Sequence, residues 1–275
     1  MRVAAICGDH PRNCTIVKFL LENPKINLVQ IILFKRDKLI PKVPKNLSQN
    51  LKKLWKLHFK KRSMAENKYF KFSAKNFPKN IDIIEITKAS DLENSEFLKK
   101  IKKLNLDACF ISSAPILSKK TLKFFPAYTV NLHLGLIPNY KGSITMFWPF
   151  YFLEPNMAGT TFHVIGEHVD TGEIIHNNVP KLKLGDGLHE VSCKAIIAAN
   201  KDIDLVVNFI ERRLQKKILP KKDPTLRFKG KFFLSSDWKP EMLEIIYDFY
   251  NDNIVDLYLK GKLISKQPKL KKLKR

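Results

Sequence analysis

Two polar residues, Asn131 and His133, lie in an otherwise apolar stretch that reads Thr-Val-Asn-Leu-His-Leu over residues 129–134. Side chains of a β-strand alternate between its faces, so these two leave from one face and Leu132 leaves from the other. A polar pair among buried strand residues needs hydrogen-bond partners or a cavity. The pair is therefore a candidate functional site. A satisfied structural pair is the alternative.

The strand that carries this pair breaks at Gly135, Pro138 and Gly142, so the pair lies near its C-terminal end. In open parallel sheets, ligands bind at that end of the strands. A second candidate segment follows, in which an alternating strand over 159–165 leads to a loop ending in Asp170-Thr171-Gly172. Asp170 is either a catalytic carboxylate or simply the first residue of an Asx turn.

The elements that position these residues predict an α/β fold. A strand over 2–7, a helix over 13–21 and a strand over 26–34 form a βαβ unit, which favours a parallel sheet with crossover helices. Gly8 lacks a surrounding G-x-G-x-x-G, so dinucleotide binding is poorly supported. The pattern continues with strands over 81–86, 106–111, 128–134, 159–165 and 173–176 and helices over 95–104, 118–125 and 187–214. We therefore expect a Rossmann-like, mostly parallel sheet with helices on both faces.

The chain is strongly basic, but its charge does not define a function. Its 275 residues include 50 Lys and Arg against 26 Asp and Glu, for a net charge of +24. Eight of the 50 are arginine, whereas dedicated readers of phosphates and bases favour arginine for its bidentate geometry. The lysines are spread through the whole sequence, as on ordinary solvated surfaces, and weak nonspecific attraction for nucleic acid follows from charge alone.

Cysteine and histidine spacing favours neither a disulfide framework nor a metal site. Four cysteines lie far apart without a C-x-x-C pair, and His168, His176 and His189 lack the spacing of metal ligands. The longest apolar runs are far shorter than the ~20 residues that cross a bilayer. We expect reduced thiols, with Cys109 and Cys193 in the core, and a cytoplasmic protein without a membrane segment.

Together, the two polar segments form an ordered pair of motifs. N-x-H-x-G-x-x-P-x-Y-x-G is followed some twenty residues later by G-x-T-x-H-x(6)-D-T-G. Over roughly residues 1–210 the chain resembles the folate-dependent formyltransferase family, whose members include the glycinamide ribonucleotide, methionyl-tRNA and amino-sugar formyltransferases. The resemblance implies an enzyme that transfers a formyl group from 10-formyltetrahydrofolate to a primary amine, without a metal or a covalent nucleophile.

The same resemblance assigns roles to individual residues. Asn131, His133 and Asp170 match the family's catalytic residues: the first two would donate to the carbonyl oxygen, and Asp170 would favour the protonated form of His133 and relay a proton. His163 would support the Asp170 loop or be a buried structural histidine. The folate-contacting positions, matched by their place in the chain, are Ser112, Ala114, Pro115, Ile116, Leu117 and Val169.

Three departures from the family pattern leave the acceptor open. Leu134-Gly135-Leu136-Ile137-Pro138 replaces the usual residues after the histidine, Lys141 replaces an arginine, and residues 35–80 are long for their region. Within that region, 35–45 is expected to be a loop, and 47–59 has the apolar spacing of a basic amphipathic helix. This 35–64 segment would cover a sheet edge or form a flap facing the substrate or RNA. The aromatic residues around Trp148 would pack a helix after the candidate loop or form a stacking platform.

We expect a catalytic domain over 1–215, a small C-terminal α+β region over 216–264 and a basic disordered tail over 265–275. The small region would contain a strand over 226–234, a helix over 240–250 and a further element over 254–259. It looks too short for the β-barrel that the resemblance leads one to expect in a methionyl-tRNA formyltransferase. A nucleotide-linked amino sugar or similar small amine is therefore the preferred acceptor, with methionyl-tRNA as the alternative.

The sequence leaves two further alternatives, one for the class of protein and one for its oligomeric state. The alternative of another class is a basic nucleic-acid-binding module on a catalytically dead transferase fold, and the presence of Asn131, His133 and Asp170 together argues against it. The resemblance also leaves a homodimer open, while the partners it implies are the folate donor and the amine acceptor.

Overall fold

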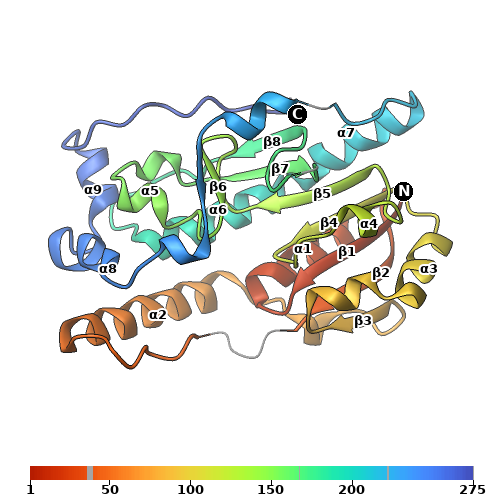
Figure 1. Ribbon diagram of the computed structural model, residues 1–275. Helices are drawn as coiled ribbons and strands as arrows, with labels where there is room; N and C mark the ends of the chain where they lie inside the picture. The colour runs from red at the N-terminus through yellow and green to blue at the C-terminus, as the bar shows by residue number, and fades with distance from the viewer. Residues whose placement is uncertain (36–39, 167, 222, 275) are drawn as a thin grey trace.

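A seven-stranded, mostly parallel sheet forms the centre of the computed structural model, which describes residues 1–35, 40–166, 168–221 and 223–274 (Figure 1). The strand order is β3-β2-β1-β4-β5-β7-β8. The first five strands of this order run parallel, and β7 runs antiparallel to both β5 and β8. The strands are β1 (Arg2–Gly8), β2 (Asn27–Phe34), β3 (Asp82–Ile86), β4 (Ala108–Ser112), β5 (Tyr128–His133), β7 (Thr160–Val164) and β8 (Ile174–Asn178).

Helices cover both faces of this sheet, as the alternation along β1 requires. Val3 and Ala5 face a core shared with α1, α6 and α7, whereas Ala4 and Ile6 face a core shared with α3 and α4. The predicted Rossmann-like α/β class is thereby confirmed. These helices are α1 (Pro11–Glu22), α3 (Ser95–Lys103), α4 (Lys119–Leu122), α6 (Leu188–Lys201) and α7 (Ile203–Gln215).

Local sequence signals set where several helices begin. Pro11 is the first residue of α1, where its missing N–H costs no hydrogen bond. Ser48 caps α2 (Gln49–Tyr69) by accepting from the Leu51 N–H, and Asn94 caps α3 through two backbone N–H groups.

The strand order reverses between β1 and β4, which places a crevice at their C-terminal ends. From β1 the chain moves outward to β2 and β3, and it then returns to β4 on the other side of β1. Ligands of open α/β sheets bind at such a reversal. Asn131 and His133 lie at the C-terminal end of β5, next to β4.

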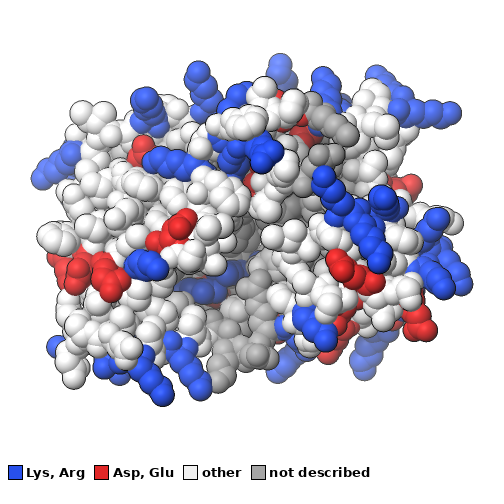
Figure 2. Space-filling model, viewed as in Figure 1, with Lys and Arg blue, Asp and Glu red and all other residues white. Residues whose placement is uncertain are grey.

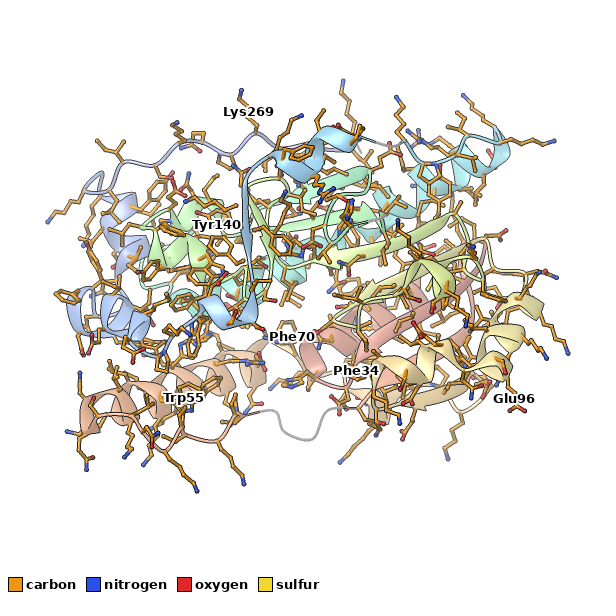
Figure 3. All side chains as sticks on the ribbon, in the orientation of Figure 1. Phe34, Trp55, Phe70, Glu96, Tyr140 and Lys269 are labelled. Carbon is orange, nitrogen blue, oxygen red and sulfur yellow. The ribbon has the colours of Figure 1, made fainter. Side chains whose placement is uncertain are left out.

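A third core joins the middle of the chain to its C-terminal part. Leu51 and Leu54 of α2 pack with Phe147 and Trp148 and with residues 243–255. In Figure 3, Trp55 and Tyr140 lie on the side of α8, whereas Phe34 and Glu96 lie on the side of the parallel strands. The elements of this part are β6 (Tyr140–Gly142), α5 (Trp148–Tyr151), β9 (Lys231–Phe233), which pairs with β6, α8 (Met242–Glu244), the π-helical turn η6 (Ile245–Phe249) and α9 (Ile254–Leu259). Short 3₁₀ turns occur at Ala74–Asn76, Ala89–Glu93, Pro155–Met157, Pro224–Phe228 and Ser235–Asp237.

Three predicted elements differ in the structure. The helix expected over 187–214 is interrupted at Asp202, whose carboxylate turns to His176 and Asn178 on β8. The strand expected over 226–234 is reduced to β9, because 224–228 forms a 3₁₀ turn. The helix expected over 240–250 consists of α8 and the π-helical turn.

The predicted helix over 47–59 is present as α2 and runs further, to Tyr69. It packs against α6 and α8, and it also lines the pocket described below. The aromatic residues after the candidate loop form α5 and are largely buried, as the packing interpretation predicted.

The end of the chain lies against β8. The Asn177 N–H donates to the Lys271 carbonyl over 2.7 Å, and the Lys271 N–H donates to Asn177 Oδ1 over 2.9 Å. Leu273 packs on the core beneath the sheet.

The division of the chain at residues 215 and 264 stays a prediction. Residues 36–39 of the expected 35–45 loop, 222 and 275 lie outside the described residues.

Positive charge is dispersed over the face of the molecule shown in Figure 2, as the sequence analysis expected. Lys and Arg side chains surround the face in Figure 2 without gathering in one patch, and that face is hollowed at its centre. Within the described ranges, no helix has the length and hydropathy needed to cross a membrane.

Truncating Ile246, which is fully buried in the third core, tests how firmly the C-terminal part is joined to the rest. We expect Ile246→Ala to lower the free energy of unfolding by about 2–5 kcal/mol, because it leaves a cavity. Denaturant unfolding followed by tryptophan fluorescence should remain one transition at lower denaturant concentration. Ile264→Ala, at a fully exposed position, is the matched control and should change stability by less than about 0.5 kcal/mol. Separate transitions for the two parts would contradict a shared core.

Candidate active site

Asn131 and His163 face each other across the antiparallel pair of β5 and β7. The register pairs these two residues directly, and the Asn131 amide nitrogen lies 3.2 Å from His163 Nε2. The Nδ1 of His163 lies 2.9 Å from the Val164 carbonyl, which can only accept, so Nδ1 carries a hydrogen. His163 is therefore oriented by its own strand and in turn orients the Asn131 side chain.

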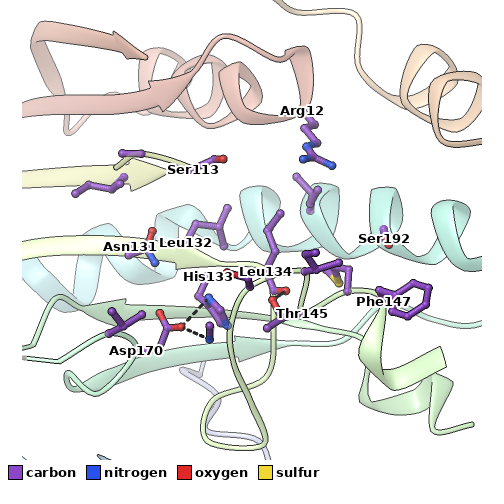
Figure 4. Close-up of a pocket in the computed structure, with 18 of the residues that line it drawn as sticks. Arg12, Ser113, Asn131, Leu132, His133, Leu134, Thr145, Phe147, Asp170 and Ser192 are labelled. Atoms are coloured by element: carbon purple, nitrogen blue, oxygen red, sulfur yellow. Dashed lines mark hydrogen bonds and ion pairs between the residues drawn. The ribbon is translucent and has the colours of Figure 1, made fainter. Parts of the chain in front are cut away.

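Asp170 brings the two histidines together. Its Oδ2 lies 3.4 Å from His133 Nδ1 (Figure 4), and its Oδ1 lies 3.4 Å from His163 Nε2. The Gly142 N–H donates to Oδ2 over 2.7 Å. All three side chains are buried. The predicted residues Asn131, His133 and Asp170 thus converge on one site, and His163 lies between two of them.

The His133 ring is fixed at both nitrogens. Its Nε2 donates to the Tyr140 carbonyl over 2.9 Å, while Nδ1 faces Asp170. Gly135 is required here, because a Cβ at that position would lie 2.6 Å from both His133 Nε2 and the Tyr140 oxygen. The glycine and the tyrosine of the first motif therefore set the orientation of its histidine.

Burial and charge act in opposite directions on this pair. Burial lowers the pKa of His133, and the nearby Asp170 carboxylate only partly offsets this effect. Asp170 thus favours the protonated form of His133, as expected, while desolvation of the ring has the larger effect on its pKa. For Asp170, burial alone would raise the pKa, but the two histidines and the Gly142 N–H lower it to about 2.

The loop that supplies the Gly142 N–H is fastened to the C-terminal part of the chain. Lys141 is buried, and its Nζ donates to the Leu226 carbonyl over 2.8 Å and to the Arg227 carbonyl over 3.2 Å. Gly142 has φ +88°, and a Cβ there would overlap the Phe233 carbonyl of β9. The close pairing of β6 with β9 thus requires this glycine.

A pocket of about 890 Å³ opens over these residues. It is lined by Asn131, His133, His163 and Asp170, and its size is in the range of small-molecule sites. Five of the six predicted folate-contacting residues line the same pocket; these are Ala114, Pro115, Ile116, Leu117 and Val169. Ser112 is buried in β4 outside the lining, and Ser113 takes its place.

The other end of the pocket contains residues that the sequence analysis did not single out as site residues. Arg12 from α1, Arg62 and Glu66 from α2, His189 from α6 and Trp238 meet there. They are far apart in the sequence and belong to no motif, so only the aromatic and basic face of α2 hinted at such a role. Figure 4 shows Arg12 on the side of the pocket opposite Asp170.

Comparison with known proteins decides the family. Residues 49–202 match the family model described as formyl transferase, which is more than half of the chain and includes both motifs. The chain belongs to the formyl transferase family. Asn131, His133 and Asp170 all fall within the matched segment.

Curated relatives of this family member include methionyl-tRNA formyltransferases. The one from Clostridium acetobutylicum is 25% identical over 76% of this chain and 69% of its own length. The one from Thermodesulfovibrio yellowstonii is 28% identical over 47% of this chain, and the match spans 41% of that relative.

Solved structures share the fold at low sequence identity. A formyltransferase from Anoxybacillus kamchatkensis, in complex with UDP-4,6-dideoxy-4-formamido-L-AltNAc and tetrahydrofolate, has a TM-score of 0.51 at 16% identity, covering 94% of this chain and 97% of that one. Glycinamide ribonucleotide transformylase 1 from Symbiobacterium toebii has a TM-score of 0.52 at 14% identity, covering 78% and 89%.

The charge coupling between His133 and Asp170 can be measured directly. In Asp170→Asn the negative charge that favours the imidazolium is lost, so the pKa of His133 should fall further below its usual value. NMR titration of the histidine ring C–H signals gives this pKa. Asp202→Asn is the matched control: its carboxylate lies 3.3 Å from His176, so it should lower the pKa of His176 and leave that of His133 unchanged. An unchanged His133 titration in Asp170→Asn would refute the coupling.

Proposed function

We propose that this chain transfers a formyl group from 10-formyltetrahydrofolate to a primary amine, carried by a nucleotide-linked amino sugar or a similar small acceptor. The observation that carries the proposal is the meeting of Asn131, His133 and Asp170 on one side of a single pocket. That pocket is also lined by residues 113–117, 165, 166 and 168–170 at one end and by a basic, aromatic group of residues at the other. A pocket with two ends suits a reaction between a donor and an acceptor.

The loop end fits a large, partly aromatic donor. Ile116 and Val169 both line the pocket, yet they are 74% and 37% exposed. Such exposed apolar side chains at a pocket rim indicate a ligand with an apolar surface. Residues 113–117 and Val169 would hold 10-formyltetrahydrofolate, which supplies the formyl group when bound. The tetrahydrofolate in the Anoxybacillus complex supports this donor.

Each polar residue has a role that follows from its protonation and partners. Asn131 would donate from its amide to a carbonyl oxygen, and one such donor contributes about 2.7–4 kcal/mol in other enzymes. The His133 imidazole would take up at Nδ1 the proton that the attacking amine releases and pass it to the folate nitrogen as the bond from that nitrogen to the formyl carbon breaks. Asp170, ionised because its pKa is about 2, would stabilise the resulting imidazolium across 3.4 Å.

Methionyl-tRNA is the second candidate acceptor, because the curated relatives reported above are methionyl-tRNA formyltransferases. The pocket argues for a smaller acceptor. Its end opposite the folate loops is walled by Trp55 and Trp238, and the latter comes from the C-terminal part packed on α2. On the face shown in Figure 2, the lysines of the described residues also form no focused surface for RNA. A homodimer stays a prediction.

Removing the side chain of either Asn131 or His133, the polar pair on β5, should abolish most of the activity. We expect Asn131→Ala and His133→Ala each to reduce turnover by about a hundredfold or more, because the lost interactions act in the transition state. Thermal shift with 5-formyltetrahydrofolate, an unreactive donor analogue, checks that the variants still fold and bind. Near-normal turnover in a folded variant would remove that residue from the mechanism.

The acceptor is tested by competition. The purified protein receives a labelled formyl donor together with charged initiator tRNA and a panel of nucleotide-linked 3-amino and 4-amino sugars at physiological salt. We expect label on an amino sugar. Label found mainly on the tRNA would overturn the sugar assignment, and label on no amine would sink the proposed transfer itself.

A further inference from the structure

One end of the pocket is built by segments that the two motifs do not include. Its residues, here called the α2 end, are Arg12, Trp55, Arg62, His189 and Trp238. They come from α1, α2, α6 and the segment before α8, and they lie in one continuous pocket with Asn131 and His133. Whatever the α2 end binds is therefore connected to the reacting groups.

The α2 end carries an excess positive charge. Glu66 Oε1 accepts from Arg12 Nη1 over 3.0 Å and from Arg62 Nε over 2.8 Å, so one carboxylate serves two guanidinium groups. Both arginine side chains are largely buried, at 23% and 20% exposure. Burial opposes ionisation of Glu66, but His10 and the two arginines lower its pKa to about 2. Two guanidinium groups thus lie around one carboxylate, and guanidinium N–H groups favour an anion.

Two buried nitrogens at the α2 end have no protein partner among the described residues. His189 is 8% exposed, and its Nε2 makes no hydrogen bond. The indole Nε1 of Trp238 is also buried and without a hydrogen bond. Buried polar atoms are nearly always paired in native proteins, so two orphans lining one pocket point to a ligand with polar atoms at that place.

Aromatic rings form a wall beside these polar groups. Trp238 lies with its ring centroid 5.6 Å from that of Trp55 and 5.9 Å from that of Phe147. His58 packs between them and His189, and its burial lowers its pKa to about 3, so its ring is neutral. A neutral aromatic surface next to a cationic cluster matches a ligand that has both a planar heterocycle and an anionic group.

We propose that the α2 end binds the nucleoside diphosphate part of the acceptor. The diphosphate faces Arg12 and Arg62, the base lies along Trp55 and Trp238, and the orphan nitrogens of His189 and Trp238 hydrogen-bond to the oxygens of this group. The amine of the linked sugar then extends toward Asn131 and His133. This assignment rests on the proposed function and deepens it, by stating which residues select the acceptor.

The test measures binding of UDP and of dTDP to the full chain by isothermal titration calorimetry at physiological salt. We expect at least one to bind, and pyrophosphate alone to bind more weakly, because it lacks a base. Arg62→Gln should weaken nucleotide binding at least tenfold. Trp238→Phe keeps an aromatic ring but removes the N–H, and should also weaken it.

The matched control is Lys60→Gln, which removes one positive charge from the exposed side of the same helix. We expect it to bind the nucleotide as the wild type does. Equal weakening by Lys60→Gln and Arg62→Gln would show a general charge effect and overturn the assignment. Thermal shift with 5-formyltetrahydrofolate confirms that each variant is folded.

Two outcomes separate this inference from the proposed function. If the wild type binds 5-formyltetrahydrofolate but neither UDP nor dTDP, the α2 end is not a nucleotide site, and the formyl transfer still stands. If the wild type binds no folate, the proposed function fails, and the acceptor assignment fails with it. Displacement of UDP by initiator tRNA with tighter binding would overturn the small acceptor in favour of a tRNA end.

Discussion

The buried carboxylate of Asp170 is the constraint on which the arrangement of this site depends. An ionised group removed from water must be matched by charge or hydrogen bonds, or its burial becomes prohibitively unfavourable. The Gly142 N–H donates to Asp170, and His133 and His163 face it from β5 and β7, so its neighbours belong to three separate elements. Strands β5 and β7 and the β6 segment, which pairs with β9, are thus held around one negative charge. The pairing of β6 with β9 and the Lys141 contacts then tie this centre to the rest of the chain.

The two ends of the pocket differ in how they are supported. The loops after β4 and β7 form an exposed, apolar rim, whereas the α2 end is enclosed by helices that share the third core. Because α2, α6 and the 243–255 segment pack together, Arg62 and Glu66 lie on a wall of packed helices.

The strand periods were sufficient to predict the α/β fold, whereas the meeting of Asn131, His133 and Asp170 was expected only from the family resemblance that the two motifs carry. Other features depend on contacts that no local pattern reports. The break at Asp202 comes from its carboxylate turning to β8, and the Asn131–His163 contact depends on an antiparallel register that the sequence does not reveal. Arg12 of α1 and Glu66 of α2 are 54 positions apart, and only tertiary packing brings them together. The pKa of His133 is lowered mainly by the burial of its ring, and the alternation of residues along a strand does not reveal how deeply a ring is buried.

The position of the last residues has a consequence for how the molecule behaves in concentrated solution. β8 is the outermost strand on its side of the sheet, and an uncovered outermost strand offers free N–H and C=O groups to any other extended chain. Here Lys271 bonds to Asn177, and the Leu273 N–H bonds to His176. The lysines that surround these contacts add mutual repulsion between molecules. The basic end of the chain thus acts as a cover that keeps this sheet from growing into an aggregate.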